Sequence, residues 1–233
     1  MVRIVVPMPA AGTIVVAVGR QHFAVVVADR LYHGHDALGR LTQGTHDKIV
    51  LHRILPLVLA TAGFAFLPPD GRPTTGDLRA VAESIKRPAD LDVAAIADRF
   101  KHRFLEIVRA CRREMTADQL DKAKIDVFVA VVRKGEASVA RLRLTDDQEF
   151  IENPPLSAPS SLETFYSGGR YADDAEVYGD RFANGPGLAR HLKRVVADGI
   201  AAEAALNGGS NLEVGGGIDI AIVDKTGARF IPA

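Results

Sequence analysis

Two runs of consecutive apolar residues near the N-terminus constrain this chain more than any other feature. Thr13–Val18 and Phe23–Ala28 are rich in valine and are separated only by Gly19–His22, so together they predict a β-hairpin. A second pair of short runs, Lys48–Leu51 and Leu57–Ala62, is apolar without alternation. Such continuity is typical of strands that are buried on both faces. Any fold for this chain therefore has to cover both sides of these strands.

Amphipathic helices provide that cover. Periodic apolar residues predict helices over Asp77–Arg87 and Leu91–Met115, and a further helix that begins at Pro186 and extends to about Ile200. The remaining strands are predicted at Ile125–Arg133, Ser138–Leu144, Thr164–Ser167, Ile218–Val223 and Ala228–Ile231, with a short helix at Tyr171–Tyr178. Loops are predicted at 32–47, which contains Gly34, Gly39 and Gly44, at 66–76 and at 154–161. Because the strands pair mainly as hairpins, we expect antiparallel sheets. Two packed sheets with helices outside both predict an α+β fold, a four-layer αββα sandwich.

Charge and cysteine content exclude several classes of protein. The 29 basic residues are balanced by 29 acidic ones, which disfavours nucleic-acid binding. No apolar run approaches the roughly 20 residues of a membrane span. The single cysteine, Cys111, excludes an internal disulfide and a multi-cysteine metal site, and its place on the helical stripe indicates a buried hydrophobe. Pro7 and Pro9 interrupt the apolar N-terminal run, so we expect a cytoplasmic protein rather than a secreted one.

Three chemistry-bearing side chains fall at the ends of predicted strands. Neighbouring strands could bring Thr13, Asp29 and Lys48 to one end of a sheet, which would place a hydroxyl, a carboxylate and an ammonium within reach of one another. A threonine hydroxyl needs a base. A cut between Gly12 and Thr13 would free an α-amine with an ordinary pKa of about 7.7–8.0, and the Lys48 ammonium would favour its neutral form. The N–H of Gly63 could stabilise an oxyanion, because glycine permits close approach.

A resemblance to a known family adds weight to this site. The segments TIVVAVGRQHFAVVVADR, DKIVL, LVLATAGF, FYSGGRYA and GGGIDIAIVD occur in the order found in proteasome β-subunits and the bacterial HslV protease. The similarity covers about residues 12–230. Within this family of N-terminal nucleophile hydrolases, the chain also resembles the divergent betaproteobacterial proteasome homologue.

The resemblance implies a role for each matching residue. Residues 1–12 would be a leader, removed after Gly12, and residues 13–233 a single hydrolase domain with Thr13 as its nucleophile. The other implied roles are the tuning of the nucleophile by Asp29 and Lys48, an oxyanion-hole amide at Gly63, support of the proton network by Ser167, and a substrate pocket lined by Thr61 and Ala65.

The resemblance also implies partners. It predicts peptides or unfolded proteins as substrates, a homo-oligomer of stacked rings, and an unfolding partner that uses ATP. No cofactor, nucleic acid or membrane is implied.

Three positions depart from the pattern of the family. Leu31 stands where many β-subunits have arginine, and Asn211 and Val214 stand where the family has aspartate and serine. Asparagine carries no charge and valine accepts no hydrogen bond, so proton handling differs here. The alternative is therefore a proteasome-like ring subunit of the same fold with weak or absent catalysis.

Two further motifs have ordinary explanations. His33, His35 and Asp36 could ligate a metal, but a loop with two histidines is more often solvated, and no third strong ligand lies nearby in the sequence. The run Gly215–Gly217 precedes a strand rather than a helix, so it lacks the helix N-terminus that a phosphate loop needs. Close packing against another strand is the expected role of these glycines.

Overall fold

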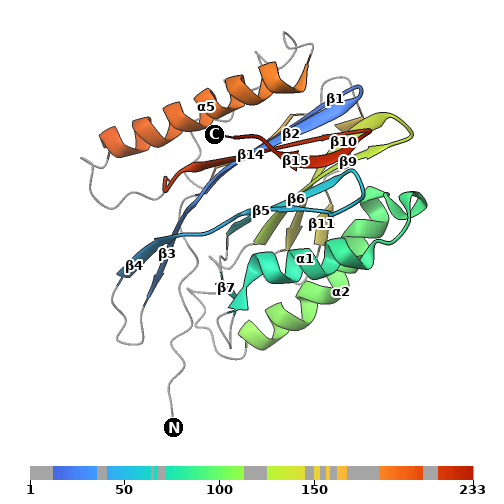
Figure 1. The fold of residues 1–233 in the computed structure, drawn as a ribbon. Helices are drawn as coiled ribbons and strands as arrows, with labels where there is room; N and C mark the ends of the chain where they lie inside the picture. The colour runs from blue at the N-terminus through green and yellow to red at the C-terminus, as the bar shows by residue number, and fades with distance from the viewer. Residues whose placement is uncertain are drawn as a thin grey trace.

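The computed structural model describes residues 13–35, 41–63, 66–67, 72–112, 125–144, 150–152, 156–157, 162–166, 184–206 and 215–232. Within these residues the chain forms three α-helices and two large antiparallel sheets, together with two short hairpins (Figure 1). The structure is thus of mixed α/β class with antiparallel sheets, as the sequence predicts.

The first sheet is built around the predicted N-terminal hairpin. Its strands, in spatial order, are β13 (Leu162–Tyr166), β1 (Ile14–Arg20), β2 (Phe23–Asp29), β14 (Ile218–Asp224) and β15 (Gly227–Phe230). Val15 lies opposite Ala28 in the β1–β2 pair, and Ile218 lies opposite Asp29 in the β2–β14 pair. The last strands of the chain therefore complete the sheet that its first strands begin.

The second sheet contains six strands. Five follow the order β11 (Phe150–Glu152), β10 (Glu136–Leu144), β9 (Ile125–Arg133), β6 (Leu57–Gly63) and β5 (Ile49–Leu51), and β12 (Leu156–Ser157) also pairs with β10. The short hairpins are β3 (Leu31–His35) with β4 (Leu41–Thr45), and β7 (Phe66–Leu67) with β8 (Arg72–Pro73).

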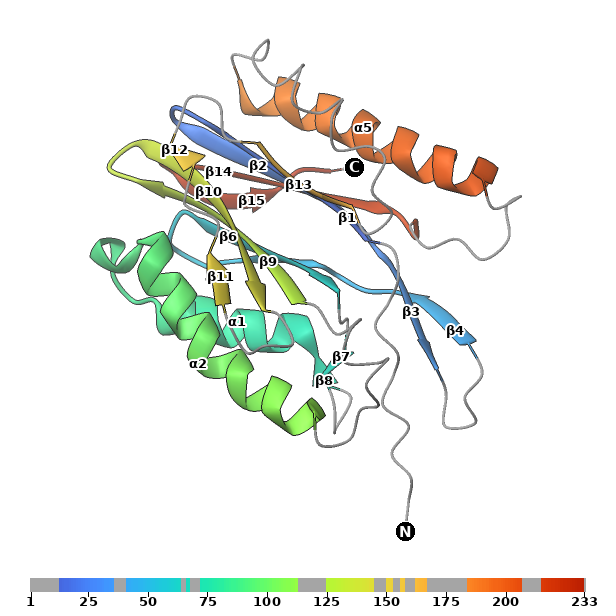
Figure 2. The same ribbon diagram turned by 180° about the vertical axis from the view of Figure 1, so that it is seen from behind.

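The helices lie on the outer faces of the two sheets. α1 (Thr74–Ser84) and α2 (Val93–Arg112) cover the six-stranded sheet, whereas α5 (Gly185–Leu206) covers the five-stranded one (Figures 1 and 2). Side chains cap two helix starts: Asp92 accepts the Ala94 N–H at 3.0 Å ahead of α2, and Asn184 accepts the Gly187 N–H at 2.8 Å in α5.

Alternation along β1 explains why its run is apolar throughout. Val16 and Val18 pack with α5 residues such as Leu192, while Val15 and Ala17 pack between the two sheets. β6 behaves in the same way, because its successive residues face alternately the other sheet and the helices α1 and α2. Burial on both faces, which the sequence predicts for this strand, is confirmed.

Several predicted boundaries shift. The first helix runs over Thr74–Ser84 instead of Asp77–Arg87, and a 3-10 turn at Pro88–Asp90 follows it. The second begins at Val93 rather than at Leu91, because Asp92 acts as its cap. The predicted strand Thr164–Ser167 is observed as β13, Leu162–Tyr166.

Three segments that the sequence presents as loops contain strands. The glycine-containing segment after Asp29 forms the β3–β4 hairpin, in which Tyr32 lies opposite Gly44. A Cβ at Gly44 would fall 2.5 Å from the Tyr32 ring, so this glycine makes room for the ring rather than breaking the strand. The loop predicted at 66–76 holds β7, β8 and the start of α1, and that predicted at 154–161 holds β12. The helix expected at Tyr171–Tyr178 lies outside the described residues.

Candidate active site

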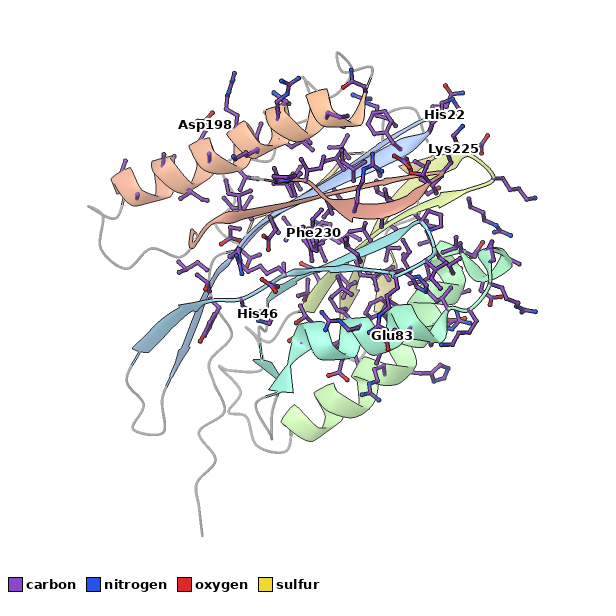
Figure 3. The ribbon with its side chains drawn as sticks, in the orientation of Figure 1. His22, His46, Glu83, Asp198, Lys225 and Phe230 are labelled. Atoms are coloured by element: carbon purple, nitrogen blue, oxygen red, sulfur yellow. The ribbon has the colours of Figure 1, made fainter. Side chains whose placement is uncertain are left out.

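Three strands from two different sheets bring the predicted hydroxyl, carboxylate and ammonium together. Thr13 directly precedes β1, Asp29 ends β2, and Lys48 directly precedes β5. The first two strands belong to the five-stranded sheet and the third to the six-stranded sheet, so the site bridges both. Figure 3 labels His46, two residues before Lys48, at this end of the molecule. The three side chains converge as expected, but across two sheets rather than at one end of a single sheet.

Lys48 lies between the other two side chains. Its Nζ donates to Oγ1 of Thr13 at 3.2 Å and to Oδ1 of Asp29 at 2.7 Å. The exposed fractions are 2% for Thr13, 0% for Asp29 and 4% for Lys48, so water screens none of these contacts. Burial lowers the pKa of Lys48 from its ordinary 10.5, although the charge and hydrogen bond of Asp29 act in the opposite direction. A larger share of this amine is therefore neutral than for a lysine in water.

The carboxylate of Asp29 accepts four hydrogen bonds. Oδ1 takes the N–H of Ile14 at 2.9 Å as well as the ammonium of Lys48. Oδ2 takes the N–H of Gly215 at 3.0 Å and that of Leu31 at 3.3 Å. Such a set of donors compensates for the loss of water around a buried charge and fixes the orientation of the group. Leu31 thus contributes to the site through its backbone N–H.

The role of Gly215 in this site is not apparent from the sequence. The sequence predicts close packing of Gly215–Gly217 before a strand, and the run does lead into β14. A backbone N–H that binds a carboxylate 186 residues away leaves no local signal. In the sequence, the glycine run itself is the one feature that marks this segment.

Gly63 and Thr61 lie along the strand that pairs with the Lys48 segment. The Thr61 N–H donates to the carbonyl of Lys48 at 3.0 Å, and Gly63 ends β6 two residues later. Thr61 shares the strand face of Leu57 and Leu59, which pack toward α1 and α2. Its Oγ1 is buried and has no hydrogen-bond partner in the described part of the chain.

Charged residues surround this end of the sheets. The Arg30 guanidinium contacts Asp47 at 2.6 Å and Asp219 at 3.6 Å, and the Arg30 carbonyl accepts the His46 N–H at 2.7 Å. Burial lowers the pKa of His46; Lys48 and Arg30 act in the same direction, and Asp47 opposes them. Burial raises the pKa of Asp219 against the effect of Arg30.

Several predicted residues cannot be placed. Gly12, Ala65, Ser167, Asn211 and Val214 all lie outside the described residues.

The other sequence predictions concern metal and membrane. The histidines proposed as metal ligands, His33 and His35, lie in β3, and Asp36 lies outside the described residues. Across the described ranges, no three histidine, cysteine or acidic residues gather as a metal site. Of the helices in those same ranges, none has the length and apolar character needed to cross a membrane.

Comparisons with known proteins add no assignment. A scan against protein-family models finds no match to this chain, and a search of the curated proteins finds none either.

Proposed function

We propose that the chain is a threonine peptidase of the N-terminal nucleophile class, in which Thr13 becomes the first residue after cleavage behind Gly12. The observation that carries this proposal is the ammonium of Lys48, buried between Thr13 Oγ1 and the carboxylate of Asp29. Lysine and aspartate are almost never fully buried unless they are paired, and here the pair adjoins a hydroxyl at a strand end.

The layering supports the same assignment. Two antiparallel sheets pack through one core, and each is covered outside by helices through a core of its own. This is the arrangement that the αββα sandwich of N-terminal nucleophile hydrolases requires. The nucleophile directly precedes a strand of one sheet and its lysine directly precedes a strand of the other.

Removal of the leader is the first proposed reaction. Oγ1 of Thr13 attacks the carbonyl carbon of Gly12, and its proton passes to the neutral amine of Lys48. The Gly12–Thr13 C–N bond then breaks as the nitrogen takes that proton from Lys48, which leaves an ester between Gly12 and Oγ1. Water hydrolyses that ester to release the Gly12 carboxylate and the free hydroxyl. The lowered pKa of Lys48 supports its role as proton acceptor in this step.

Peptide hydrolysis follows with the freed α-amine as the base. That amine takes the proton of Oγ1 as Oγ1 attacks the carbonyl carbon of the substrate, and it returns the proton to the leaving amine as the peptide C–N bond breaks. Water then hydrolyses the ester on Oγ1, which releases the second product and restores the hydroxyl. In its protonated form, Lys48, held by Asp29, places positive charge next to this amine and favours the neutral form of the amine. The N–H of Gly63 would bind the oxyanion, and Thr61, Ala65 and Ser167 would hold the roles that the family resemblance implies.

The resemblance also suggests the setting of the reaction. Peptides or unfolded proteins would be the substrates, and stacked rings of this chain would enclose the sites. An unfolding partner that uses ATP would deliver protein substrates.

Intact-mass spectrometry of the purified protein tests the proposal. The wild type should lose residues 1–12, and Thr13→Val, which keeps the shape of the side chain without its hydroxyl, should retain them. Thr226→Ala is the matched control, because Thr226 is exposed in the turn between β14 and β15. It should mature and cleave fluorogenic peptides like the wild type.

Two results would count against the proposal. Retention of Met1 in the wild type, together with silence toward fluorogenic peptides, would favour the alternative of a ring subunit without catalysis. Leader removal that proceeds equally well in Thr13→Val would assign the cut to another protease.

A further inference from the structure

The glycine run that precedes β14 adopts a backbone that other residues rarely accept. Gly215, Gly216 and Gly217 have φ angles of +144°, +70° and +104°. At Gly216 the space is closed as well, since a Cβ would lie 2.9 Å from Thr45 Cγ2 and 3.0 Å from the Leu31 nitrogen. The turn is thus pressed against the backbone that follows Asp29.

Gly215 holds both the side chain of Asp29 and the chain beyond it. Its N–H donates to Oδ2 of Asp29 at 3.0 Å. Its carbonyl accepts the N–H of Arg30 at 2.9 Å and that of Leu31 at 2.7 Å. One residue therefore ties the carboxylate to the backbone that carries it, and the unusual φ angles direct its two polar groups toward that segment.

These contacts divide the two carboxylate oxygens between different donors. Oδ1 faces Lys48 and the N–H of Ile14, and Oδ2 faces the N–H groups of Gly215 and Leu31. If Oδ2 lost its backbone donors, the carboxylate could rotate and offer both oxygens to the ammonium. Lys48 would then be drawn away from Oγ1 of Thr13, which it reaches at 3.2 Å.

We propose that the glycine turn Gly215–Gly217 is a positioning element of this site. It holds Oδ2 of Asp29 away from Lys48, so that the Lys48 ammonium keeps its hydrogen bond to Oγ1 of Thr13. This inference rests on the proposed function for its role in catalysis. The geometric part, the control of Lys48 by the turn, stands apart from any peptidase activity.

The kinetic test compares glycine variants of equal size. Gly215→Ala and Gly216→Ala should remove the leader about 100-fold more slowly than the wild type, because small misplacements in a site have effects of this order. Gly135→Ala is the matched control: Gly135 also has positive φ, at +82°, and a Cβ there would meet nothing within 4 Å. Gly135 lies in the turn between β9 and β10, so leader removal should stay within about twofold of the wild type.

The spectroscopic test does not require an active enzyme. All samples carry Thr13→Val, so that under the proposal each keeps its leader. NMR of labelled lysine side chains follows the titration of Lys48, and the resonance that disappears in Lys48→Arg is assigned to Lys48. The pKa of Lys48 should rise in Gly215→Ala and Gly216→Ala and stay unchanged in Gly135→Ala. The other charged groups at this end, Arg30, Asp47, His46 and Asp219, are the same in all samples.

The outcomes separate the positioning role of the glycine turn from the proposed peptidase function. An unchanged Lys48 titration in folded Gly215→Ala and Gly216→Ala overturns the positioning role. A raised pKa with no leader removal in the wild type supports positioning and rejects the proposed function. If neither glycine variant folds, Asp29→Asn supplies the decision: the Gly215 amide resonance should move upfield far more than that of Gly217, and equal movement overturns the inference.

Discussion

The two ends of the sheets carry ion pairs of the same length in opposite surroundings. Lys48 and Asp29 approach to 2.7 Å with side chains that are 5% and 0% exposed. Arg229 and Asp224, in the β14–β15 hairpin at the other end, also approach to 2.7 Å but are 50% and 23% exposed. Water and salt weaken the second pair, whereas the first is buried among backbone N–H donors. Distance alone therefore does not distinguish the two pairs, whereas burial and the set of surrounding donors do.

The exposed end is made of hairpin turns. His22, Lys134 and Lys225 all lie in such turns and are exposed, and Figure 3 shows His22 and Lys225 at this end, far along the sheets from His46. The His22 ring contacts the Gly135 carbonyl at 2.8 Å, which links two turns. Charges here lie beside solvent. At the other end, backbone N–H groups from separate segments converge on one carboxylate.

The largest difference between the two ends should appear in the free energy of unfolding when the cation of each pair is replaced. Lys48→Met leaves the Asp29 carboxylate buried without its partner, and we expect a loss of about 3–5 kcal/mol in the free energy of unfolding. Arg229→Met should cost at most about 1 kcal/mol. Urea unfolding of both variants measures the two values, and similar losses would erase the distinction between the ends.

A double-mutant cycle measures the coupling free energy within each of the two ion pairs. Lys48→Met combined with Asp29→Asn removes both charges, so the double variant should be less destabilised than the sum of the single variants by about 0.5–3 kcal/mol. The cycle on Arg229 and Asp224 should give a smaller coupling, below about 0.5 kcal/mol. Additive behaviour at Lys48 and Asp29 would mean that the buried contact contributes little.

Alkaline stability should report the burial of Lys48. Its pKa is lowered in the folded state, so between that value and the ordinary 10.5 the unfolded chain binds the proton that the folded chain has lost. The free energy of unfolding contributed by this group should therefore rise with pH through that window and fall as the pH drops through the folded pKa. Lys48→Met lacks this contribution. Parallel profiles of the free energy of unfolding against pH for the wild type and Lys48→Met would contradict the expected difference.

The contribution of His46 to the pH dependence of stability should be the smallest of these effects, because His46 is only partly buried. Its pKa is lowered from 6.5, so acidification from that value down to the folded pKa protonates the unfolded chain first. Stability should decrease over this window, and His46→Gln should decrease less. Thermal unfolding at a series of acidic pH values measures the slopes, and identical slopes would mean that His46 does not contribute.

Much of the fold was accessible from local patterns. Valine runs such as Phe23–Ala28 predict strands because β-branched side chains favour the extended backbone, and periodic apolar residues predict the long helices. The β3–β4 hairpin was missed because its glycines resemble loop residues. Only the ring of Tyr32 over Gly44 shows why a glycine belongs in that strand.

The amino-acid sequence already shows which groups are available for chemistry at this site: a threonine ahead of a strand, an aspartate at the end of the next, and a lysine ahead of a third. Tertiary structure alone decided their relation, because Lys48 comes from the other sheet and the Gly215 N–H lies 186 residues beyond Asp29. Hydrogen bonds of that kind depend on the register of distant strands and on φ angles that only packing selects. No local pattern encodes them.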